Sequence, residues 1–442
     1  MDIIHITPHV GGGVGSVLNT WVHNDNYNTH GIICLEPPNR VPAYLGKCIL
    51  DTQNTRQHVR NADVVVFHLW NNPPMYDLLT GVSDIHLPDK FRAVAWGHSS
   101  GTYPPYMVYS RQILSYFDKI VFTSPISYTT ISKLQRSRYK NKLCSIWSTS
   151  GLCIGSELYR PGLNITYIGS MDLKKMAPWF FDACYDIIAL IDNVKFHMVG
   201  DGPDLHTMRK DVISNGRKDN FMFHGYTKDI KQLLAITNVF GYPLSRFHFG
   251  TCEQVIGEAM SCGIPVVSTD NKAESYILKN GHYGLLSKDK DTYVKNVIQL
   301  IHDERLYAIL AERSLERAKD LYSVDRMITL WNSLLKQVAV LPKIKKQWSD
   351  RKTIARGFDV FLESIGKYSR LFCDIDDDAN YTISKVLRVT DTTPSCWSGP
   401  NKGTPEHYIK HYVNNYNLRD QKLERCVNQI KEREEKSNEK SY

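Results

Sequence analysis

The stretch HFGTCEQVIGEAMSCGIPVVS, residues 248–268, places two glutamates around a glycine-rich helix start. Gly250 and Thr251 can open a helix whose first backbone N–H groups lack intrahelical partners, and its apolar residues recur on one face. Such a helix N-terminus attracts anions. Glu258, about two turns further along, suits a hydroxyl-rich ligand better than a phosphate. The stretch therefore predicts a ligand site at a helix start, followed by a buried strand over 264–268.

The composition is that of an ordinary globular protein. Of the 442 residues, 42% are apolar, 23% charged and 11% aromatic, which excludes an intrinsically disordered chain. This length has room for about three domains of ~150 residues. The formal net charge of +8 is compatible with an anionic ligand or an acidic membrane surface, and also with a simple excess for solubility. No run approaches ~18 apolar residues, so we expect no membrane-spanning helix.

The cysteines and the first residues indicate a cytoplasmic protein. The ten cysteines, at 34, 48, 144, 153, 184, 252, 262, 373, 396 and 426, form no Cys-x-x-Cys pair and no spacing typical of zinc sites. We expect them to be thiols in a reducing compartment. The sequence MDIIHI reads directly as a strand, with an acid where a signal peptide has its basic region.

Strands alternate with helices along two successive halves of the chain. We expect strands at 2–7, 31–35, 64–68, 93–96 and 120–123, and then at 163–169, 194–200, 221–225, 239–243 and 264–268. This alternation is typical of parallel α/β sheets, so we expect two such halves to meet near residue 160, with a helix over 324–338 closing the second. Open parallel sheets bind ligands at the carboxyl ends of their strands, and the cleft between the halves is the expected site.

The character of the sequence changes after Pro342. Residues 343–348, KIKKQW, read as a basic linker, and the remaining hundred residues combine helical patterns with a loop at 392–405. We expect the charged stretch from Leu418 to the last residue to be a helix that frays into a tail.

A glycine loop, residues 11–15, lies between the first expected strand and an amphipathic helix. Glycines there let the backbone approach a phosphate or a sugar closely. Glu36, at the end of the next strand, supports a dinucleotide site, whereas Ser16 stands where the third glycine of that fingerprint belongs. A purely structural turn also remains open.

The segment EAMSCGIPVV, residues 258–267, resembles the signature of retaining GT-B glycosyltransferases of the large family 4, the group 1 glycosyl transferases. The resemblance implies an α/β fold of two Rossmann-like domains facing across a cleft. Residues 1–160 would form the acceptor domain and residues 161–340 the nucleotide-sugar donor domain, while residues 341–442 would be a mainly helical extension of unknown role.

Within this family the second glutamate of the signature binds the donor ribose, and this role falls on Glu258. The usual first glutamate position is occupied by Gly250, and the nearby acid is Glu253. The segment HFGTCE, residues 248–253, is similar to a variant found in part of the superfamily, which implies that Glu253 holds the donor sugar.

The resemblance to this family also implies roles for two further segments. Residues 167–176 are similar to the family loop in which an arginine and a lysine clamp the donor diphosphate; Lys175 falls on the lysine position, and Ser170 replaces the arginine. Lys174 or Arg246 would compensate. His98 follows the strand 93–96, where a family histidine lines the acceptor side and touches the donor sugar, and His68 lies at a similar strand end.

The implied catalytic residues are His98, Glu253 and Lys175. The implied donor-binding residues are Gly12, Gly13, Gly15, Gly169, Lys174, Lys175, Gly200, Gly225, Tyr226, Gly250, Thr251, Glu253 and Glu258. We expect no metal and no cofactor besides the nucleotide-sugar co-substrate. The acidic run at 374–378 contains an Asp-x-Asp pattern, which indicates either a metal site or, far from the glycine loops, a solvated turn.

The expected activity is transfer of a sugar from a nucleotide-sugar to a hydroxyl of a saccharide or lipid-linked saccharide acceptor, with retention at the anomeric carbon, in polysaccharide or glycoconjugate biosynthesis. Nucleic acid is not an expected partner, and residues 136–142 and 343–348 could make peripheral membrane contact. Three alternatives stay open: another GT-B enzyme such as a nucleotide-sugar epimerase or phosphorylase, an NAD-dependent oxidoreductase using the N-terminal glycine loop, and a non-catalytic scaffold.

Overall fold

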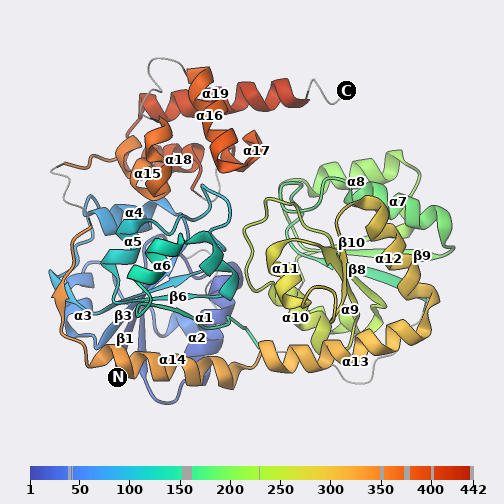
Figure 1. Cartoon of the computed structure of the whole chain (residues 1–442), viewed down its shortest axis with the longest axis horizontal. Coiled ribbons are helices and arrows are strands. Elements are labelled where there is room, and N and C mark those ends of the chain that lie inside the picture. Colours follow the sequence, from blue (N-terminus) through green and yellow to red (C-terminus); the bar gives the residue numbers. More distant parts are fainter. Residues whose placement is uncertain are drawn as a thin grey trace. The chain divides into compact units, whose positions relative to one another are not determined.

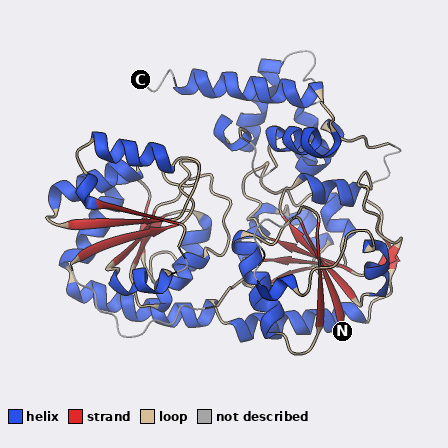
Figure 2. Cartoon of the chain, turned by 180° about the vertical axis from the view of Figure 1, so that it is seen from behind, coloured by secondary structure: helices blue, strands red, loops and turns tan. Residues whose placement is uncertain are grey.

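The computed structural model describes residues 1–37, 41, 43–151, 162–227, 229–348, 353–372, 379–399 and 403–438. Its chain forms two compact units, each with a parallel sheet between layers of helices (Figures 1 and 2). The first unit comprises Met1–Ser150, Phe249–Thr251 and Val324–Tyr442, and the second comprises Gly151–His248 and Cys252–Ser323. Two α/β halves and a mainly helical C-terminal extension are thus confirmed.

The first unit is built on a six-stranded parallel sheet in the order β2-β1-β3-β5-β6-β7. Its strands are β1 (Asp2–Thr7), β2 (Thr29–Cys34), β3 (Val64–Leu69), β5 (Ala93–Gly97), β6 (Lys119–Phe122) and β7 (Leu143–Ser145). The central strands are continuous apolar runs buried on both faces, as parallel sheets require. The helices in this part of the unit are α1 (Gly12–Asn24), α2 (Ala43–Gly46), α3 (Thr55–Asn61), α4 (Pro73–Thr80), α5 (Arg111–Tyr116), η1 (Pro125–Thr130), α6 (Lys133–Arg138) and α14 (Val324–Ala339).

Helix α14 belongs to the first unit, so the expectation that it closes the second half is wrong. Its apolar face packs on the sheet of the first unit (Figure 1). Trp331 is fully buried there, stacked on Trp21 at 4.3 Å between ring centroids and 4.8 Å from Trp96. The amphipathic pattern predicts a buried face, but it does not say which sheet that face covers.

The stretch over 343–348 is a fixed strap and not a free basic linker. Ile344–Lys345 (β14) pairs antiparallel with Lys90–Phe91 (β4). The buried Lys346 ammonium lies 2.7 Å from the Asp118 carboxylate, and the indole N–H of the buried Trp348 donates to Glu363. Lys346 and Trp348 are therefore unavailable for membrane contact, whereas Ile344 and Lys345 are exposed.

The extension continues with α15 (Phe358–Ile365), η3 (Gly366–Phe372), α16 (Ala379–Thr390), α17 (Pro394–Trp397), α18 (Pro405–Tyr416) and α19 (Gln421–Asn438). Buried polar contacts tie it to the first half of the unit: the Asn71 amide donates to the Ser364 hydroxyl at 3.1 Å and accepts from the Tyr408 hydroxyl at 3.0 Å. Helix α17 lies inside the stretch expected as a loop. The expected acidic turn at 374–378 lies outside the described residues.

The second unit has a six-stranded parallel sheet in the order β10-β9-β8-β11-β12-β13. Its strands are β8 (Leu163–Ile168), β9 (Val194–Val199), β10 (Phe221–Gly225), β11 (Val239–Tyr242), β12 (Val266–Thr269) and β13 (Leu285–Ser287). Its helices are α7 (Phe180–Leu190), α8 (Leu205–Ser214), η2 (Lys218–Asn220), α9 (Ile230–Ile236), α10 (Gln254–Ser261), α11 (Lys272–Ile277), α12 (Lys290–His302) and α13 (Glu304–Leu321). The strand order reverses direction between β8 and β11, which makes this the topological switch point where open sheets bind ligands.

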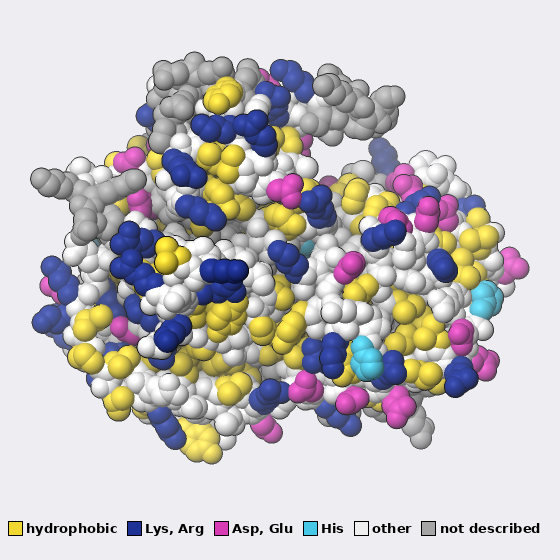
Figure 3. All heavy atoms as spheres, viewed as in Figure 1, with side chains coloured by type: hydrophobic (Ala, Val, Ile, Leu, Met, Phe, Trp, Pro, Cys, Tyr) yellow, Lys and Arg dark blue, Asp and Glu magenta, His cyan; other side chains and the backbone are white. Residues whose placement is uncertain are grey.

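Three further observations concern the cysteines, the hydropathy of the helices and the charge of the surface. The described cysteines are free thiols, and Cys153 and Cys373 lie outside the described residues. No helix among the described residues is long and apolar enough to span a bilayer. On the face shown in Figure 3, lysine and arginine side chains gather over the first unit, where α6 and the turn after it expose Lys133, Arg138 and Lys140.

Candidate functional site

The loops after β8 and β11 flank the switch point of the second unit and are joined to each other. The Ser245 N–H donates to the Lys175 carbonyl at 2.8 Å, and the Ala177 N–H donates to the Pro243 carbonyl at 3.0 Å. This pairing places Lys175 beside the end of β11, with its Nζ 5.4 Å from the centroid of the Tyr242 ring. The sequence-predicted lysine therefore lies at the carboxyl edge of the sheet.

Glu253 lies near this lysine and occupies the N-cap position of α10, without a side-chain capping hydrogen bond. The helix begins at Gln254, so the expectation that Gly250 and Thr251 open it is wrong. Thr251 instead belongs to the first unit, where its hydroxyl accepts from the Thr123 hydroxyl at 2.9 Å. Gly250 belongs to the same short segment. The helix N-terminus, with its anion-attracting N–H groups, is thus one turn later than predicted.

The Glu253 carboxylate is held ionised in a nearly buried position. Its Oε2 accepts from the Tyr242 hydroxyl at 2.8 Å, and its Oε1 lies 3.7 Å from His248 Nδ1. Burial alone would raise the pKa of this carboxyl, but the charges of His248 and Lys175 and the Tyr242 hydrogen bond outweigh it and lower the pKa. The site therefore carries a fixed negative charge next to a lysine.

Glu274, on α11, is a site residue that sequence reasoning missed. Its side chain is completely buried. Burial and the nearby charge of Glu253 raise the pKa of Glu274 to about 8, so it is protonated at neutral pH. The signal available in the sequence was an acid shortly after the strand at 264–268, which is weak without knowledge of burial.

His248, Glu253 and Glu274 form the acidic cluster of the second unit. One ligand atom from each lies within 4.8 Å of the others, a geometry that can hold a metal ion. A protonated Glu274 is a poor metal ligand, however, and Lys175 already supplies positive charge beside Glu253. The ionised Glu253 carboxylate suits a sugar hydroxyl instead, because it accepts hydrogen bonds.

Glu258 lies on the half-buried side of α10, and burial raises the pKa of its carboxyl. Ile256 and Met260 on the same helix are fully buried, and a Cβ on Gly257 would lie 2.6 Å from the Tyr322 ring. Gly263, with φ of +59°, ends the segment in a conformation that suits glycine. Most of the signature is therefore explained by packing, whereas packing does not explain Glu258.

Glycines end the strands on the other side of the switch point. The Gly200 N–H donates to the Gly225 carbonyl at 2.8 Å, and a Cβ on Gly200 would lie 1.9 Å from the Gly169 oxygen. Glycine is therefore required at position 200 by the close approach of the neighbouring backbone. Gly225 has φ of +66°, but a Cβ there would meet no neighbouring atom, and the next residue, Tyr226, is 67% exposed. The donor-binding roles of Gly225 and Tyr226 stay predictions.

The glycines expected as a loop form the first turn of α1, which begins at Gly12 after the carboxyl end of β1, so the expectation of a loop over 11–15 is wrong. Gly15 is required by packing, because a Cβ there would lie 1.8 Å from the Val10 carbonyl oxygen. Gly12 has φ of +61°, which favours glycine. At Gly13 neither φ nor crowding demands glycine. This position is therefore free to serve the approach of a ligand.

His98 directly follows β5, and its Nε2 lies 3.0 Å from Nδ1 of the buried His68. His98 itself is half-buried. Two other predicted cations, Lys174 and Arg246, are exposed on the loops after β8 and β11, and the Arg246 guanidinium lies 5.5 Å from the Phe247 ring centroid. Each of these side chains is thus at the carboxyl edge of its own sheet.

A cavity of about 760 Å³ opens at the carboxyl ends of β1 and β2 in the first unit. The extension closes it with α18, and the cavity is lined by His9, Val10, Gly11, Leu35, Glu36, Pro37, Pro74, Asp77, Ser83, Asp84, Ile85, His411, Asn415 and Tyr416. Burial raises the pKa of the Glu36 carboxyl. The lining contains three carboxyl groups and no lysine or arginine. The sequence analysis named the glycine loop and Glu36 as a possible ligand site, but it did not predict that the C-terminal extension contributes to it.

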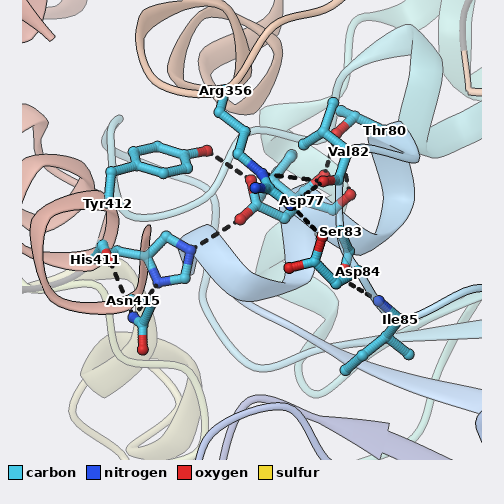
Figure 4. Close-up of polar contacts among 11 residues, drawn as sticks. Asp77, Thr80, Val82, Ser83, Asp84, Ile85, Arg356, His411, Tyr412 and Asn415 are labelled. Carbon is cyan, nitrogen blue, oxygen red and sulfur yellow. Dashed lines mark hydrogen bonds and ion pairs between the residues drawn. The ribbon is translucent and has the colours of Figure 1, made fainter. Parts of the chain in front are cut away.

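Asp77 links the cavity to the extension (Figure 4). Its carboxylate accepts from the Tyr412 hydroxyl at 2.5 Å and lies 2.8 Å from His411 Nε2. Beside it, the Arg356 guanidinium donates to the Val82 carbonyl and to Asp84, both at 2.7 Å. The extension is thereby part of the cavity and not an appended tail.

The topology of the two units defines the class of fold. Two parallel α/β units with a helical C-terminal part are the GT-B architecture, and solved structures with this architecture align with the chain. Anabaena Alr3699/HepE in complex with UDP aligns over its full length with 76% of this chain, with a TM-score of 0.55 and 15% identity. The lipopolysaccharide outer core galactosyltransferase WaaB also aligns over its full length with 76% of the chain, with a TM-score of 0.52 and 17% identity.

Part of the chain also matches known sequences. A family model described as glycosyl transferases group 1 matches residues 162–303. N-acetyl-alpha-D-glucosaminyl L-malate synthase of Bacillus anthracis is 27% identical over 150 residues, which are 34% of this chain and 38% of that protein. The lipopolysaccharide core biosynthesis glycosyltransferase LpsE of Rhizobium meliloti is 26% identical over 157 residues, 35% of this chain and 45% of that protein. The chain thus spans less than half the length of these relatives.

Proposed function

We propose that this protein is a retaining glycosyltransferase that moves a sugar from a nucleotide-sugar to an acceptor hydroxyl in glycoconjugate or polysaccharide biosynthesis. The observation that carries the proposal is the group formed by Lys175, Glu253 and Glu274 at the switch point of the second unit. The match of residues 162–303 to group 1 glycosyl transferases supports it and argues against an oxidoreductase built on the N-terminal glycine loop.

Each part of the donor has a candidate partner in the second unit. Lys175 and the N-terminus of α10 would neutralise the diphosphate as it leaves, since both offer positive potential at one place. Glu258 would accept hydrogen bonds from the ribose hydroxyls. Glu253 would hold a hydroxyl of the transferred sugar, while Glu274, whose side chain is completely buried, would act on the sugar only through Glu253. Structures of HepE contain UDP and UDP-glucose, so uridine nucleotide-sugars are the first donors to try.

Retention fits the chemistry of this donor site. Neither Glu253, held by Tyr242, nor Glu274, protonated and buried, is suited to act as a free nucleophile. In a front-face displacement the bond to the leaving phosphate breaks as the acceptor hydroxyl approaches from the same side, and the phosphate oxygen takes the hydroxyl proton. The residues then have only to stabilise charge and position the sugar, and no metal is needed if Lys175 neutralises the diphosphate.

The acceptor would bind in the cavity of the first unit. Glu36, Asp77 and Asp84 contribute carboxyl groups to its lining, and that lining has no cationic side chain of lysine or arginine. A phosphorylated acceptor headgroup is disfavoured there, and an uncharged or amine-bearing saccharide is favoured. If the saccharide is carried on a lipid, the basic surface at 136–142 would face the anionic bilayer.

The experiment is a panel of nucleotide-sugars tested for thermal stabilisation and then for transfer to saccharide acceptors, with and without a chelator. A nucleotide-sugar at a hundred times its dissociation constant should add ~2.7 kcal/mol to the free energy of unfolding. The anomeric coupling constant of the product, measured by NMR, decides retention or inversion. The variant Glu258→Ala should lose most of the nucleotide stabilisation. The proposal fails if no nucleotide-sugar stabilises the protein and none is consumed.

A further inference from the structure

One stretch, most of it in the first unit, carries most of the net positive charge of the chain. Between Asp118 and Glu157 the sequence has no acidic residue and six basic ones. The basic residues are Lys119, Lys133, Arg136, Arg138, Lys140 and Lys142. The stretch therefore contributes six positive charges to a formal net charge of +8, although it is less than a tenth of the chain.

The acid at the start of the stretch does not offset this charge. The Asp118 carboxylate is nearly buried and lies 2.7 Å from the buried Lys346 ammonium, so its charge is already compensated. In the part of the chain that the structure describes, Lys133, Arg138 and Lys140 form no ion pair. All three side chains are exposed. Their positive charge is therefore available to a partner outside the protein.

Helix α6 projects a leucine into solvent between two of these cations. Leu134 is 80% exposed. It lies four residues before Arg138, so the two are neighbours on one face of the helix, and Lys133 adjoins Leu134 on the other side. Tyr139, which ends the helix, is buried and anchors α6 by its opposite side. A single exposed leucine is common, but a leucine between unpaired cations is typical of helices that lie at a lipid interface.

The turn after α6 extends this surface. Lys140 is exposed there, and the Lys119 ammonium donates to the Asn141 carbonyl at 2.8 Å. That carbonyl holds the ammonium group in place but does not cancel its charge. On the face shown in Figure 3, the lysine and arginine side chains of the first unit gather over this part of the molecule. We name the following residues the basic face: Lys119, Lys133, Leu134, Arg138 and Lys140.

We propose that the basic face docks on an anionic lipid bilayer, with its cations at the phosphate groups and Leu134 at the boundary of the acyl chains. Each cation near an anionic bilayer surface tightens binding about fivefold, and an aliphatic side chain adds to this by leaving water. A nucleic acid also attracts cations, but its bases stack on aromatic side chains, and Tyr139 beside these cations is buried. The bilayer is therefore the partner that uses both parts of the basic face.

The docking rests on the proposed function only for its purpose, which is to bring the protein to a lipid-linked saccharide. The docking itself follows from charge and exposure. Four cations and one leucine are few compared with an anchoring helix, so the contact should be reversible. It should also depend strongly on salt, because ions screen charges at a surface.

Sedimentation of the full-length protein with vesicles tests the docking without any substrate. Vesicles of phosphatidylcholine with about a third of phosphatidylglycerol should bind the protein in dilute salt, whereas vesicles of phosphatidylcholine alone should not. Binding should weaken more than about tenfold between about 0.05 M and about 0.5 M salt. Equal binding to both kinds of vesicle, or no binding to the anionic ones, would overturn the proposal.

Substitutions on the basic face distinguish it from the overall charge of the protein. Arg138→Gln and Lys140→Gln should each weaken binding to anionic vesicles about fivefold, and the double variant about 25-fold. Lys336→Gln removes an exposed charge from α14 and is the matched control, which should bind as the wild type does. All three side chains are exposed, so thermal unfolding should stay unchanged. If Lys336→Gln weakens binding as much as Arg138→Gln does, the net charge attracts the bilayer and the proposal fails.

Leu134→Ser decides between a bilayer and a nucleic acid. It should weaken binding to anionic vesicles about three- to tenfold, because the apolar contribution is lost, and it should leave binding to a DNA duplex unchanged. A protein that binds the duplex more tightly than the vesicles, with both unaffected by Leu134→Ser, would have a nucleic acid as its partner. That result would overturn the proposal.

Transfer assays separate the docking from the proposed function. The double variant of Arg138 and Lys140 should transfer sugar to a soluble saccharide as the wild type does, and it should be at least about tenfold slower with an acceptor carried in anionic vesicles. An unchanged rate with the vesicle-borne acceptor would overturn the purpose given to the docking. Vesicle binding without transfer to any acceptor would refute the proposed function alone, whereas transfer without vesicle binding would overturn the docking alone.

Discussion

Replacing Glu274 by glutamine should change how the stability of the protein depends on pH. In the folded protein the pKa of Glu274 is raised from 4.5 to about 8. Between these values the unfolded chain has lost a proton that the folded chain keeps, so the free energy of unfolding falls as pH rises from about 4.5 to 8. The free energy of unfolding falls by about 1.36 kcal/mol per pH unit, and the total loss reaches about 5 kcal/mol above pH 8.

Glu274→Gln removes this titration while keeping the shape of the side chain. The variant and the wild type should have similar stability near pH 5, and at pH 9 the variant should be the more stable by up to about 5 kcal/mol. Urea denaturation at pH values from 5 to 9 measures the difference. Glu253→Gln should narrow the pH range over which stability is lost, because it removes the charge that helps to raise the pKa of Glu274.

The exposed Glu316 on α13 offers the matched control, since Glu316→Gln should leave the pH dependence as it is in the wild type. The reasoning is refuted if Glu274→Gln and wild type lose stability in parallel between pH 5 and 9. A parallel loss would mean that Glu274 is ionised in the folded protein, and the acidic cluster would then carry two negative charges, as a metal site requires.

Three further predictions concern the loops and the core. Lys175→Met should lower kcat/KM for transfer about 10²- to 10³-fold by removing charge stabilisation at the leaving group, whereas Lys336→Met, exposed on α14, should leave it unchanged. Trp331→Ala should cost about 3–5 kcal/mol in urea denaturation, since the ring is fully buried against Trp21; a loss below ~1 kcal/mol would contradict the packing described. Gly15→Ala should destabilise the fold because its Cβ would meet the Val10 oxygen, whereas Gly13→Ala should fold normally and weaken ligand binding, as calorimetry can show.

Features that depend on local pattern could be predicted from the sequence. The central strands are apolar runs bounded by turn residues, and Val64–Leu69 lies within one residue of its predicted bounds. The placement of His98 directly after a strand also followed from such a run, whereas Lys175 was named through the resemblance of its loop. The roles given to these residues stay predictions.

Features that depend on which surfaces meet could not be predicted. The apolar face of α14 is visible in the sequence, but its partner sheet is decided by shape, with Trp331 fitting against Trp21. Glu274 is unremarkable until α11 buries it beside Glu253. The rings of His5 and His68 come together only through the order of strands in the sheet.

The start of α10 was misplaced for a similar reason. Thr251 is a good helix-capping residue by type, but its hydroxyl is engaged by Thr123, and Glu253 occupies the capping position. Local sequence preference therefore predicts a helix start at Thr251, and because of these tertiary contacts the helix begins one turn later.

The return of α14 to the first unit has a consequence for the order of events during synthesis. Strands β1 to β7 leave the ribosome first, but the helix that covers Trp21 and Trp96 is made only after residue 324. The second unit, made almost entirely in between, has all its strands by residue 287 and can fold while the first is still incomplete. Until α14 emerges, the tryptophan face of the first sheet is exposed to the cell, so a chain that stops before residue 324 should become a client of chaperones and proteases even though its second unit is whole.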